Sequence, residues 1–201
     1  MPPQHPPLTD PHPEVAHFLS LPWCRHLLTA SPTLTIHPCI TRTPKPHHEE
    51  ALMATTLNSP RTISAFVLFY EPPPPTTTGT PGMLTSLSAL LTLGPLLNGW
   101  RGLCHGGAIM TVLDEVLGQI PALNRASGAL PDRTTLTAYL NTRFEAPVRT
   151  DEDVGGKTVV VRARLTRREG RKMWIEGAME EEGGRVLARA EALFVQIKEK
   201  L

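Results

Sequence analysis

The sequence has few aromatic residues, few cysteines, almost no net charge and no long apolar run. Aromatic residues make up 5% of the 201 residues, three residues are cysteine, and the formal net charge is +1. Three cysteines cannot form a disulfide framework, and a balanced charge argues against a nucleic-acid-binding protein. No segment approaches 18 consecutive apolar residues, and the first residues resemble neither a signal peptide nor a transit peptide. We therefore expect a cytoplasmic protein without a membrane span, although a mitochondrial location stays open.

Proline and histidine are concentrated in the first part of the chain. Seventeen of the 21 prolines lie at or before Pro81, and seven of the eight histidines lie at or before His48. This change of composition predicts two regions. The first is a Pro/His-rich extension over residues 1–60, with a short helix from Pro13 followed by an extended stretch, and the second is a folded domain over residues 61–201. We expect neither a metal site nor a cofactor, because adjacent histidines rarely reach one ion and no second cluster exists.

Alternating apolar and polar residues after residue 60 predict mostly strands. The region 105–119 is the exception, because apolar residues cover most of its surface at helical spacing and it must be enclosed on several sides. A helix that covers one face of an antiparallel sheet is an α+β fold, and short glycine turns predict a meander for the last four strands. The pattern of residues 84–93 fits either a strand or a short helix. In the strand 134–147 the alternation places Thr137 and Leu140 on opposite faces. The strands are predicted at 61–70, 134–147, 157–168, 172–180 and 186–197.

The predicted helix begins with His105, Gly106 and Gly107, and it carries Asp114 and Glu115 near its middle. Glycine costs about 1 kcal/mol relative to alanine inside a helix, so the pair needs a reason. It permits a tight turn or close packing, or it exposes backbone N–H groups that polarise a carbonyl oxygen at the positive end of the helix dipole. Adjacent helical residues point about 100° apart, so we expect only one of the two acids to face a site and the other to face solvent.

This combination resembles the hotdog-fold acyl-CoA thioesterases, in particular the group that includes the phenylacetyl-CoA and 4-hydroxybenzoyl-CoA enzymes. Residues 104–114 (CHGGAIMTVLD) are similar to the helix motif of that family, and residues 137–148 (TAYLNTRFEAPV) to its following strand. The resemblance covers about residues 61–198. It implies a hotdog fold, in which an antiparallel sheet wraps around one long central helix. It also implies an enzyme that hydrolyses acyl-CoA or a carrier-bound acyl thioester.

The resemblance further implies roles for individual residues. Asp114 corresponds to the acid that serves as general base or nucleophile, the backbone N–H of Gly106 polarises the thioester carbonyl, and Thr137 positions the water or substrate. Some relatives use an Asn or Gln shortly before His-Gly-Gly, where Asn98 lies one residue out of register. His105 either orients the helix start or transfers a proton. The candidates for substrate binding are His105, Gly107, Asn98 and Arg143, the last as one of several basic residues expected near the CoA phosphates.

The spacing of the motif predicts an assembly of at least two subunits. Gly106 and Asp114 are eight residues apart, which is about 12 Å along a helix. A donor and a base that act on one carbon must both lie within about 3 Å of the reacting atoms. Two antiparallel helices from two subunits meet this condition, so we expect a homodimer or a dimer of dimers.

Two other functions remain open at this point. The first is a non-catalytic acyl-binding or assembly protein on the same scaffold, against which the acid and the glycines argue. The second is a hotdog dehydratase or hydratase. Those enzymes place an Asp and a His in one site, and Asp132 is followed by no histidine.

Overall fold

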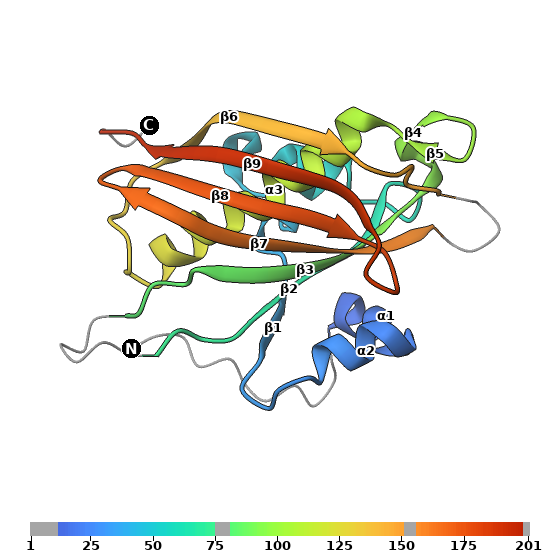
Figure 1. The fold of residues 1–201 in the computed structure, drawn as a ribbon, viewed down its shortest axis with the longest axis horizontal. Coiled ribbons are helices and arrows are strands. Elements are labelled where there is room, and N and C mark those ends of the chain that lie inside the picture. The colour runs from blue at the N-terminus through green and yellow to red at the C-terminus, as the bar shows by residue number, and fades with distance from the viewer. Residues whose placement is uncertain (1–11, 75–80, 151–155, 199–201) are drawn as a thin grey trace.

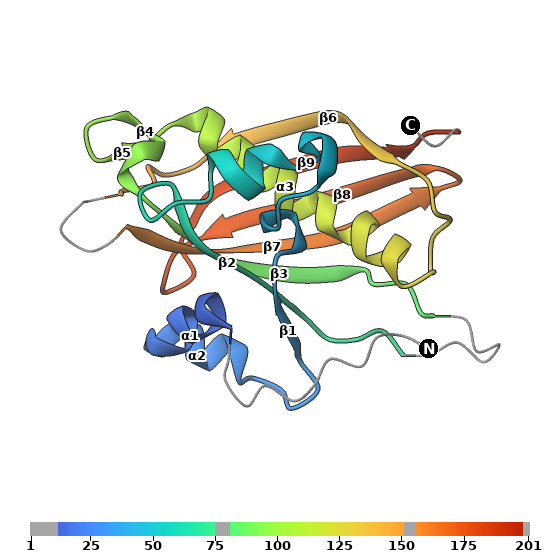
Figure 2. The ribbon, with the colours of Figure 1, turned by 180° about the vertical axis from the view of Figure 1, so that it is seen from behind.

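The fold is built on one antiparallel sheet of seven strands, with a long helix packed on one face (Figure 1, Figure 2). The computed structural model describes residues 12–74, 81–150 and 156–198. This arrangement confirms the predicted α+β hotdog class. The strands, in their order across the sheet, are β1 (Thr35–Pro38), β2 (Ile63–Tyr70), β3 (Ser86–Leu93), β7 (Lys157–Glu169), β8 (Lys172–Glu180), β9 (Val186–Gln196) and β6 (Thr135–Phe144).

The central helix α3 (Gly106–Ala126) is longer than its apolar pattern predicts, since it continues for five residues beyond Pro121. Alternate residues of β3, β7, β8 and β9 pack against its buried side chains. The approach is closest at Gly177 of β8, where a Cβ atom would lie 2.5 Å from Leu117 Cδ1. The buried apolar residues of α3 are Ile109, Val112, Leu113, Val116, Leu117 and Ile120.

The strand order differs from the predicted meander. β7, β8 and β9 do form a meander, but β6 pairs with β9 and lies at the edge of the sheet. The turns between β7, β8 and β9 are short and contain glycine, whereas β6 and β7 are separated by residues 145–156. A connection of that length does not require its two strands to be neighbours. The ambiguous segment 84–93 forms β3, which pairs with both β2 and β7.

A bulge in β6 also changes the predicted alternation. The register of β6 against β9 shifts between Thr137 and Tyr139. As a result Thr137 reaches α3, on the same side as Leu140, which packs against the core. The prediction that these two residues lie on opposite faces is therefore wrong, because one extra residue in a strand reverses the facing of everything on one side of it.

The segments before β2 lie on both faces of the sheet. The helices α1 (Pro13–Ser20) and α2 (Pro22–Leu28) pack on the face opposite α3, in a second core that includes Val67 and Val160. β1 then pairs with β2 at the edge. The chain continues through η1 (Ile40–Arg42), η2 (Pro46–His48) and η3 (Leu52–Thr56), which lie beside α3 (Figure 2).

Two further short strands lie just before α3. β4 (Asn98–Trp100) and β5 (Leu103–Cys104) form a separate two-stranded sheet, and η4 (Pro95–Leu97) precedes them. No helix in the described ranges is long and apolar enough to cross a membrane.

Candidate active site

The start of α3 is fixed by the side chain of His105. His105 is the N-cap, and its Nδ1 accepts a hydrogen bond of 2.9 Å from the backbone N–H of Gly107. Two glycines make room for this ring: a Cβ at Gly99 would lie 2.6 Å from His105 Cδ2, and one at Gly107 would lie 3.0 Å from Nδ1. This geometry supports the capping role of His105 and supplies a physical reason for Gly107.

Gly106 is the first residue of α3. The i→i−4 hydrogen bonds of the helix leave its backbone N–H unpaired within α3, at the positive end of the helix dipole. A Cβ at Gly106 would lie 3.3 Å from Cζ of Phe144, whose side chain is half exposed. A side chain at this position would therefore press on the Phe144 ring, which would have to shift by a few tenths of an ångström.

The structure brings Asp114 and Thr137 together. The Thr137 hydroxyl donates a hydrogen bond of 2.9 Å to Asp114 Oδ1, and it joins the middle of α3 to the edge strand β6. The bulge described above makes this contact possible. Hydrogen bonds to a carboxylate are charge-assisted, so this bond fixes the rotamer of Asp114 more firmly than a neutral pair would.

Asp114 opens into a pocket of about 270 Å³ beside α3. Glu115 lines the same pocket, so the expectation that only one of the two acids faces a site is wrong. The pocket extends around α3, from β6 on one side to the segment 41–50 on the other. Two neighbouring side chains that point in different directions from the helix can therefore both line it. The lining residues are Thr41, Glu49, Glu50, Asp114, Glu115, Gly118, Gln119, Pro121, Ala122, Arg125, Thr134, Thr135, Thr137 and Phe194.

Glu115 occupies the inner part of this pocket. Its carboxylate accepts a hydrogen bond of 2.6 Å from Gln119 Nε2. Burial raises the pKa of Glu115, and the nearby Glu50 and Asp114 act in the same direction, whereas hydrogen bonds from Thr41 and Gln119 oppose the shift. The net effect raises the pKa of Glu115 and so favours its neutral carboxyl.

Three pocket residues come from the Pro/His-rich part of the chain: Thr41, Glu49 and Glu50, here called the N-terminal wall. An ion pair holds this wall to α1, since Arg42 Nε lies 2.7 Å from Glu14 Oε1. The prediction of site residues missed all three wall residues. No local motif marks them, because they reach the pocket only through the docking of a segment that is more than 60 residues away from Asp114 in sequence.

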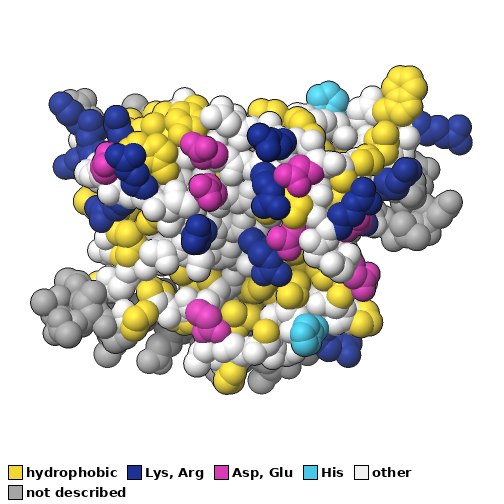
Figure 3. Space-filling model, viewed as in Figure 1, with side chains coloured by type: hydrophobic (Ala, Val, Ile, Leu, Met, Phe, Trp, Pro, Cys, Tyr) yellow, Lys and Arg dark blue, Asp and Glu magenta, His cyan; other side chains and the backbone are white. Residues whose placement is uncertain are grey.

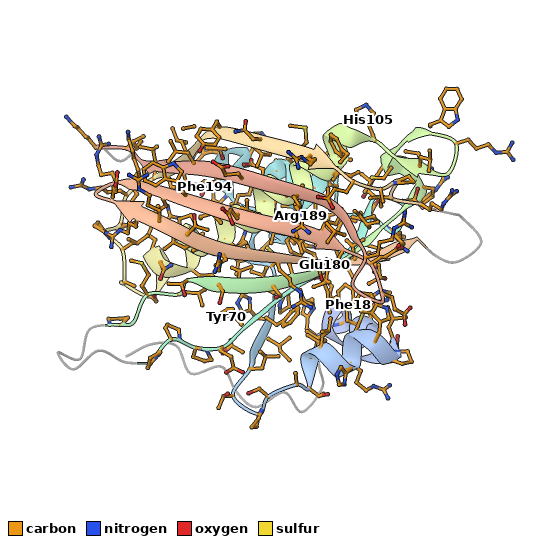
Figure 4. All side chains as sticks on the ribbon, in the orientation of Figure 1. Phe18, Tyr70, His105, Glu180, Arg189 and Phe194 are labelled. Atoms are coloured by element: carbon orange, nitrogen blue, oxygen red, sulfur yellow. The ribbon has the colours of Figure 1, made fainter. Side chains whose placement is uncertain are left out.

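Two of the predicted site residues, Arg143 and Asn98, do not line this pocket. Arg143 points to the face of the sheet that α3 leaves open, where it lines a groove of about 520 Å³ with Arg164 and Arg189. Figure 3 shows basic and acidic side chains mixed on this face, and Figure 4 labels Arg189 there. Asn98 lies in β4, where its Oδ1 accepts a hydrogen bond from the Thr150 hydroxyl.

The helix start and the pocket lie apart within one chain. In Figure 4, His105 and the pocket residue Phe194 lie toward opposite ends of the sheet. Cys104, beside His105, has a pKa raised to about 11 by burial, so its thiol is protonated at neutral pH and is a poor nucleophile. Gly106 is the first residue of α3, whereas Asp114 lies near the middle of the helix.

Part of the chain matches a family of known proteins. Residues 101–188, which contain α3, β6 and most of the following strands, match the family model of the thioesterase superfamily. Acyl-coenzyme A thioesterase THEM4 of Bos taurus is 32% identical over 105 residues, which are 52% of this chain and 38% of the bovine protein. The chain thus spans well under half the length of this thioesterase relative.

One solved structure shares the arrangement of strands and helix. The putative thioesterase yhdA of Lactococcus lactis superposes with a TM-score of 0.51 at 14% identity, over 73% of this chain and 98% of that one. At this identity the likeness shows the hotdog fold alone. The BH2602 protein of Bacillus halodurans, solved with CoA, has a TM-score of 0.46 at 26% identity, over 55% of this chain and 66% of its own.

Proposed function

We propose that this protein hydrolyses an acyl thioester, acyl-CoA in the first place, to the free acid and the thiol. The observation that carries the proposal is the bond between Thr137 and Asp114 at the mouth of a pocket, within residues of the thioesterase superfamily. The bovine relative is an acyl-coenzyme A thioesterase, which supports the same substrate class for this chain. We assign the activity to a domain over residues 61–201, with residues 1–60 as an extension.

In the proposed mechanism Asp114 is the reacting carboxylate. It either removes a proton from water as the water attacks the thioester carbon, or attacks that carbon itself to form a mixed anhydride that water then hydrolyses. Thr137 holds Oδ1, which leaves Oδ2 for the reaction. The backbone N–H of Gly106 donates to the carbonyl oxygen as negative charge develops there, and the C–S bond breaks to release CoA thiolate.

The mechanism requires Gly106 of one subunit to face Asp114 of another, because the two are about 12 Å apart along α3. The edge of the sheet supports such a dimer. β6 is a ten-residue strand at the end of the sheet, and near it the large apolar side chains of Leu136 and Phe144 are 47% and 50% exposed. A long edge strand presents unpaired backbone N–H and C=O groups with which a second chain can pair. We propose a homodimer through this edge, alone or within a dimer of dimers.

The activity is tested by following free thiol release from a panel of short, long and aromatic acyl-CoAs, with the wild type beside Asp114→Asn. We expect turnover on at least one substrate and its collapse in the variant. A non-catalytic acyl-binding protein would bind the same acyl-CoAs without releasing thiol, and Asp114→Asn would leave that binding unchanged. Light scattering on the same samples tests the dimer.

A further inference from the structure

The turn between β7 and β8 is strongly basic. Residues 167–172 (RREGRK), here called the basic tip, hold four cations against one acid, a net charge of +3, although the whole chain has a net charge of only +1. All the charged side chains of the tip are exposed. Positive charge is therefore concentrated at one end of the sheet in a protein that is otherwise nearly neutral.

The single acid of the basic tip is already bound. Arg167 Nε donates to Glu169 Oε1 at 2.9 Å. The same guanidinium lies 4.6 Å from the centre of the Trp174 ring, which holds it against the sheet. Glu169 thus neutralises Arg167, and the positive charge of the rest of the tip stays uncompensated.

The other three cations are not neutralised by an ion pair in residues 12–74, 81–150 and 156–198. Arg171 Nη1 donates to the carbonyl oxygen of Gln196 at 2.7 Å, which orients the side chain and leaves its charge. Arg168 and Lys172 have no ion pair in these ranges. Guanidinium and ammonium groups in this state are suited to carboxylates and phosphates, which arginine binds through two parallel hydrogen bonds.

One row of paired residues connects the basic tip to the pocket beside Asp114. Thr137 of β6 is opposite Phe194 of β9, and both line the pocket. Met173 of β8 is opposite Phe194 on one side and Arg168 of β7 on the other. Adjacent strands lie about 4.8 Å apart, so Arg168 is about 14 Å from Thr137 across three strand spacings.

The end of the pocket and the basic tip are also joined along the chain. The backbone N–H of Gln196 donates to Arg171 O at 2.9 Å, and that of Ile197 donates to Thr134 O at 2.9 Å. Thr134 lines the pocket. In Figure 4, Phe194 lies toward this end of the sheet, and Figure 3 shows basic side chains gathered there beside apolar ones. A partner bound at the tip is therefore next to the pocket.

Apolar side chains beside the basic tip favour a protein partner. Leu136 is opposite Val195, which is opposite Lys172, so the three lie in one row. Leu136 is 47% exposed. Arginine and tryptophan beside exposed apolar side chains are typical of protein interfaces. A nucleotide phosphate needs the cations but not this apolar surface.

On the basis of the proposed thioesterase function, we propose that the basic tip docks an acidic carrier protein that bears the acyl group on a phosphopantetheine arm. Carboxylates of the carrier and the phosphate of its arm pair with Arg168, Arg171 and Lys172, and the arm brings the thioester to Asp114. The hydrolysis keeps its balance: water supplies the new oxygen of the acid, the C–S bond breaks, and the arm leaves as the thiol. The substrate is thus chosen by its carrier as well as by its acyl group.

The test compares three thioesters of one acyl group: on an acidic acyl carrier protein, on CoA, and on N-acetylcysteamine, which has neither phosphate nor protein. We expect kcat/KM at low salt to be at least about tenfold higher for the carrier protein than for CoA. The advantage should decline as salt screens the charges. An equal kcat/KM for the two, or a higher one for CoA, would overturn the proposal.

Charge reversal assigns the effect to the basic tip. Arg168→Glu and Lys172→Glu should each lower kcat/KM for the carrier-bound thioester about tenfold and leave the N-acetylcysteamine thioester unchanged. Arg185→Glu is the matched control, because it makes the same change of charge at the opposite end of β8 and β9, where Arg185 is 66% exposed and lies 3.7 Å from Glu181. An equal loss in Arg185→Glu, an equal loss on CoA, or no loss at all would each refute docking at the tip.

Binding separates this inference from the proposed activity. Fluorescence anisotropy of a labelled carrier protein with an unacylated arm measures docking without turnover. Binding that Lys172→Glu weakens, with no thioester hydrolysed, would keep the docking surface and reject the thioesterase. Hydrolysis of acyl-CoA with no binding of the carrier would keep the thioesterase and reject the docking surface. Sedimentation with vesicles of anionic phospholipid, without binding of the carrier, would assign the tip to a membrane surface and also reject the proposal.

Discussion

The pocket has two walls that come from different parts of the chain. The wall made by α3 and β6 depends on Asp114 and Thr137, which are 23 positions apart and joined by one hydrogen bond of 2.9 Å. The N-terminal wall belongs to a segment outside the matched residues 101–188, and it is tied to α1 through Arg42 and Glu14. The difference indicates that the two walls are held by independent contacts, so that each can be disturbed without the other.

The largest effect is expected from Asp114→Asn. Asparagine keeps the size of the side chain and an oxygen that accepts from Thr137, but it can neither take a proton nor attack a thioester. We expect kcat to fall about 1000-fold, within the range for loss of a general base. Thiol release under saturating substrate measures this.

Glu115→Gln is the matched control, since it neutralises the neighbouring acid in the same pocket. We expect it to change KM and the preference among substrates more than kcat. If Glu115→Gln lost activity as completely as Asp114→Asn, the assignment of the reacting carboxylate would have to be revised.

Arg42→Met should weaken the attachment of the N-terminal wall to α1 and leave the wall made by α3 and β6 unchanged. It leaves the carboxylate of Glu14, which is 15% exposed, without its partner. Breaking such a pair costs about 3 kcal/mol of unfolding free energy, which urea titration measures. The double variant Arg42→Met/Glu14→Gln should recover part of this loss. An unchanged stability of Arg42→Met would show that the ion pair does not anchor the wall.

Thr137→Val tests the other wall. A hydrogen bond to a charged acceptor contributes about 1.5–3 kcal/mol. If the bond from Thr137 to Asp114 is needed in the transition state, its loss should lower kcat/KM about 10- to 100-fold. Thr137→Ser should restore most of the activity, because it keeps the hydroxyl. Thr142→Val is the control on the same strand, since Thr142 Oγ1 is buried with no hydrogen-bond partner in the described ranges. A comparable loss in Thr142→Val would point to distortion of β6 instead.

The smallest effect concerns the docking of α1. His17 Nε2 is 2.9 Å from Thr92 Oγ1, and burial lowers the pKa of His17, against the opposing effect of Glu14. The folded state thus binds this proton less readily than the unfolded state. Stability is full above the ordinary histidine pKa of about 6.5 and declines as the pH falls below it, toward the lowered value.

The unfolding free energy, measured by urea titration between about pH 7.5 and 5.5, should show this decline. His17→Gln should reduce the dependence on pH. His26→Gln, at an exposed position on α2, should not. Equal pH profiles for the wild type and His17→Gln would refute the role of His17.

The sequence predicted the parts of the fold that depend on neighbouring residues. The periodicity of β2, β7, β8 and β9 and the apolar surface of α3 were sufficient to place these elements, because each pattern acts within a few turns or strand positions. The motif from His105 to Asp114 also lies within one element, so its residues were recognised together. The helix was predicted too short, since its continuation beyond Pro121 depends on packing and not on propensity.

Contacts between distant segments could not be predicted in the same way. The position of β6 beside β9, the bulge that turns Thr137 toward Asp114, and the N-terminal wall all depend on which surfaces meet after folding. The expectation that only one of the two acids, Asp114 or Glu115, faces a site treated the helix as isolated. It did not anticipate a pocket that follows the helix surface around from β6 to Thr41.

The sequence by itself determined the class of fold, the buried helix, its glycine start and the carboxylate of Asp114, because side-chain periodicity and helix-end chemistry are local properties. Only the tertiary structure decided what surrounds that carboxylate. Thr137 reaches it through a one-residue shift in strand register, and Thr41 and Glu50 reach the pocket through the docking of a remote segment. These contacts minimise the free energy of the whole chain, and no short stretch of sequence contains the information that sets them.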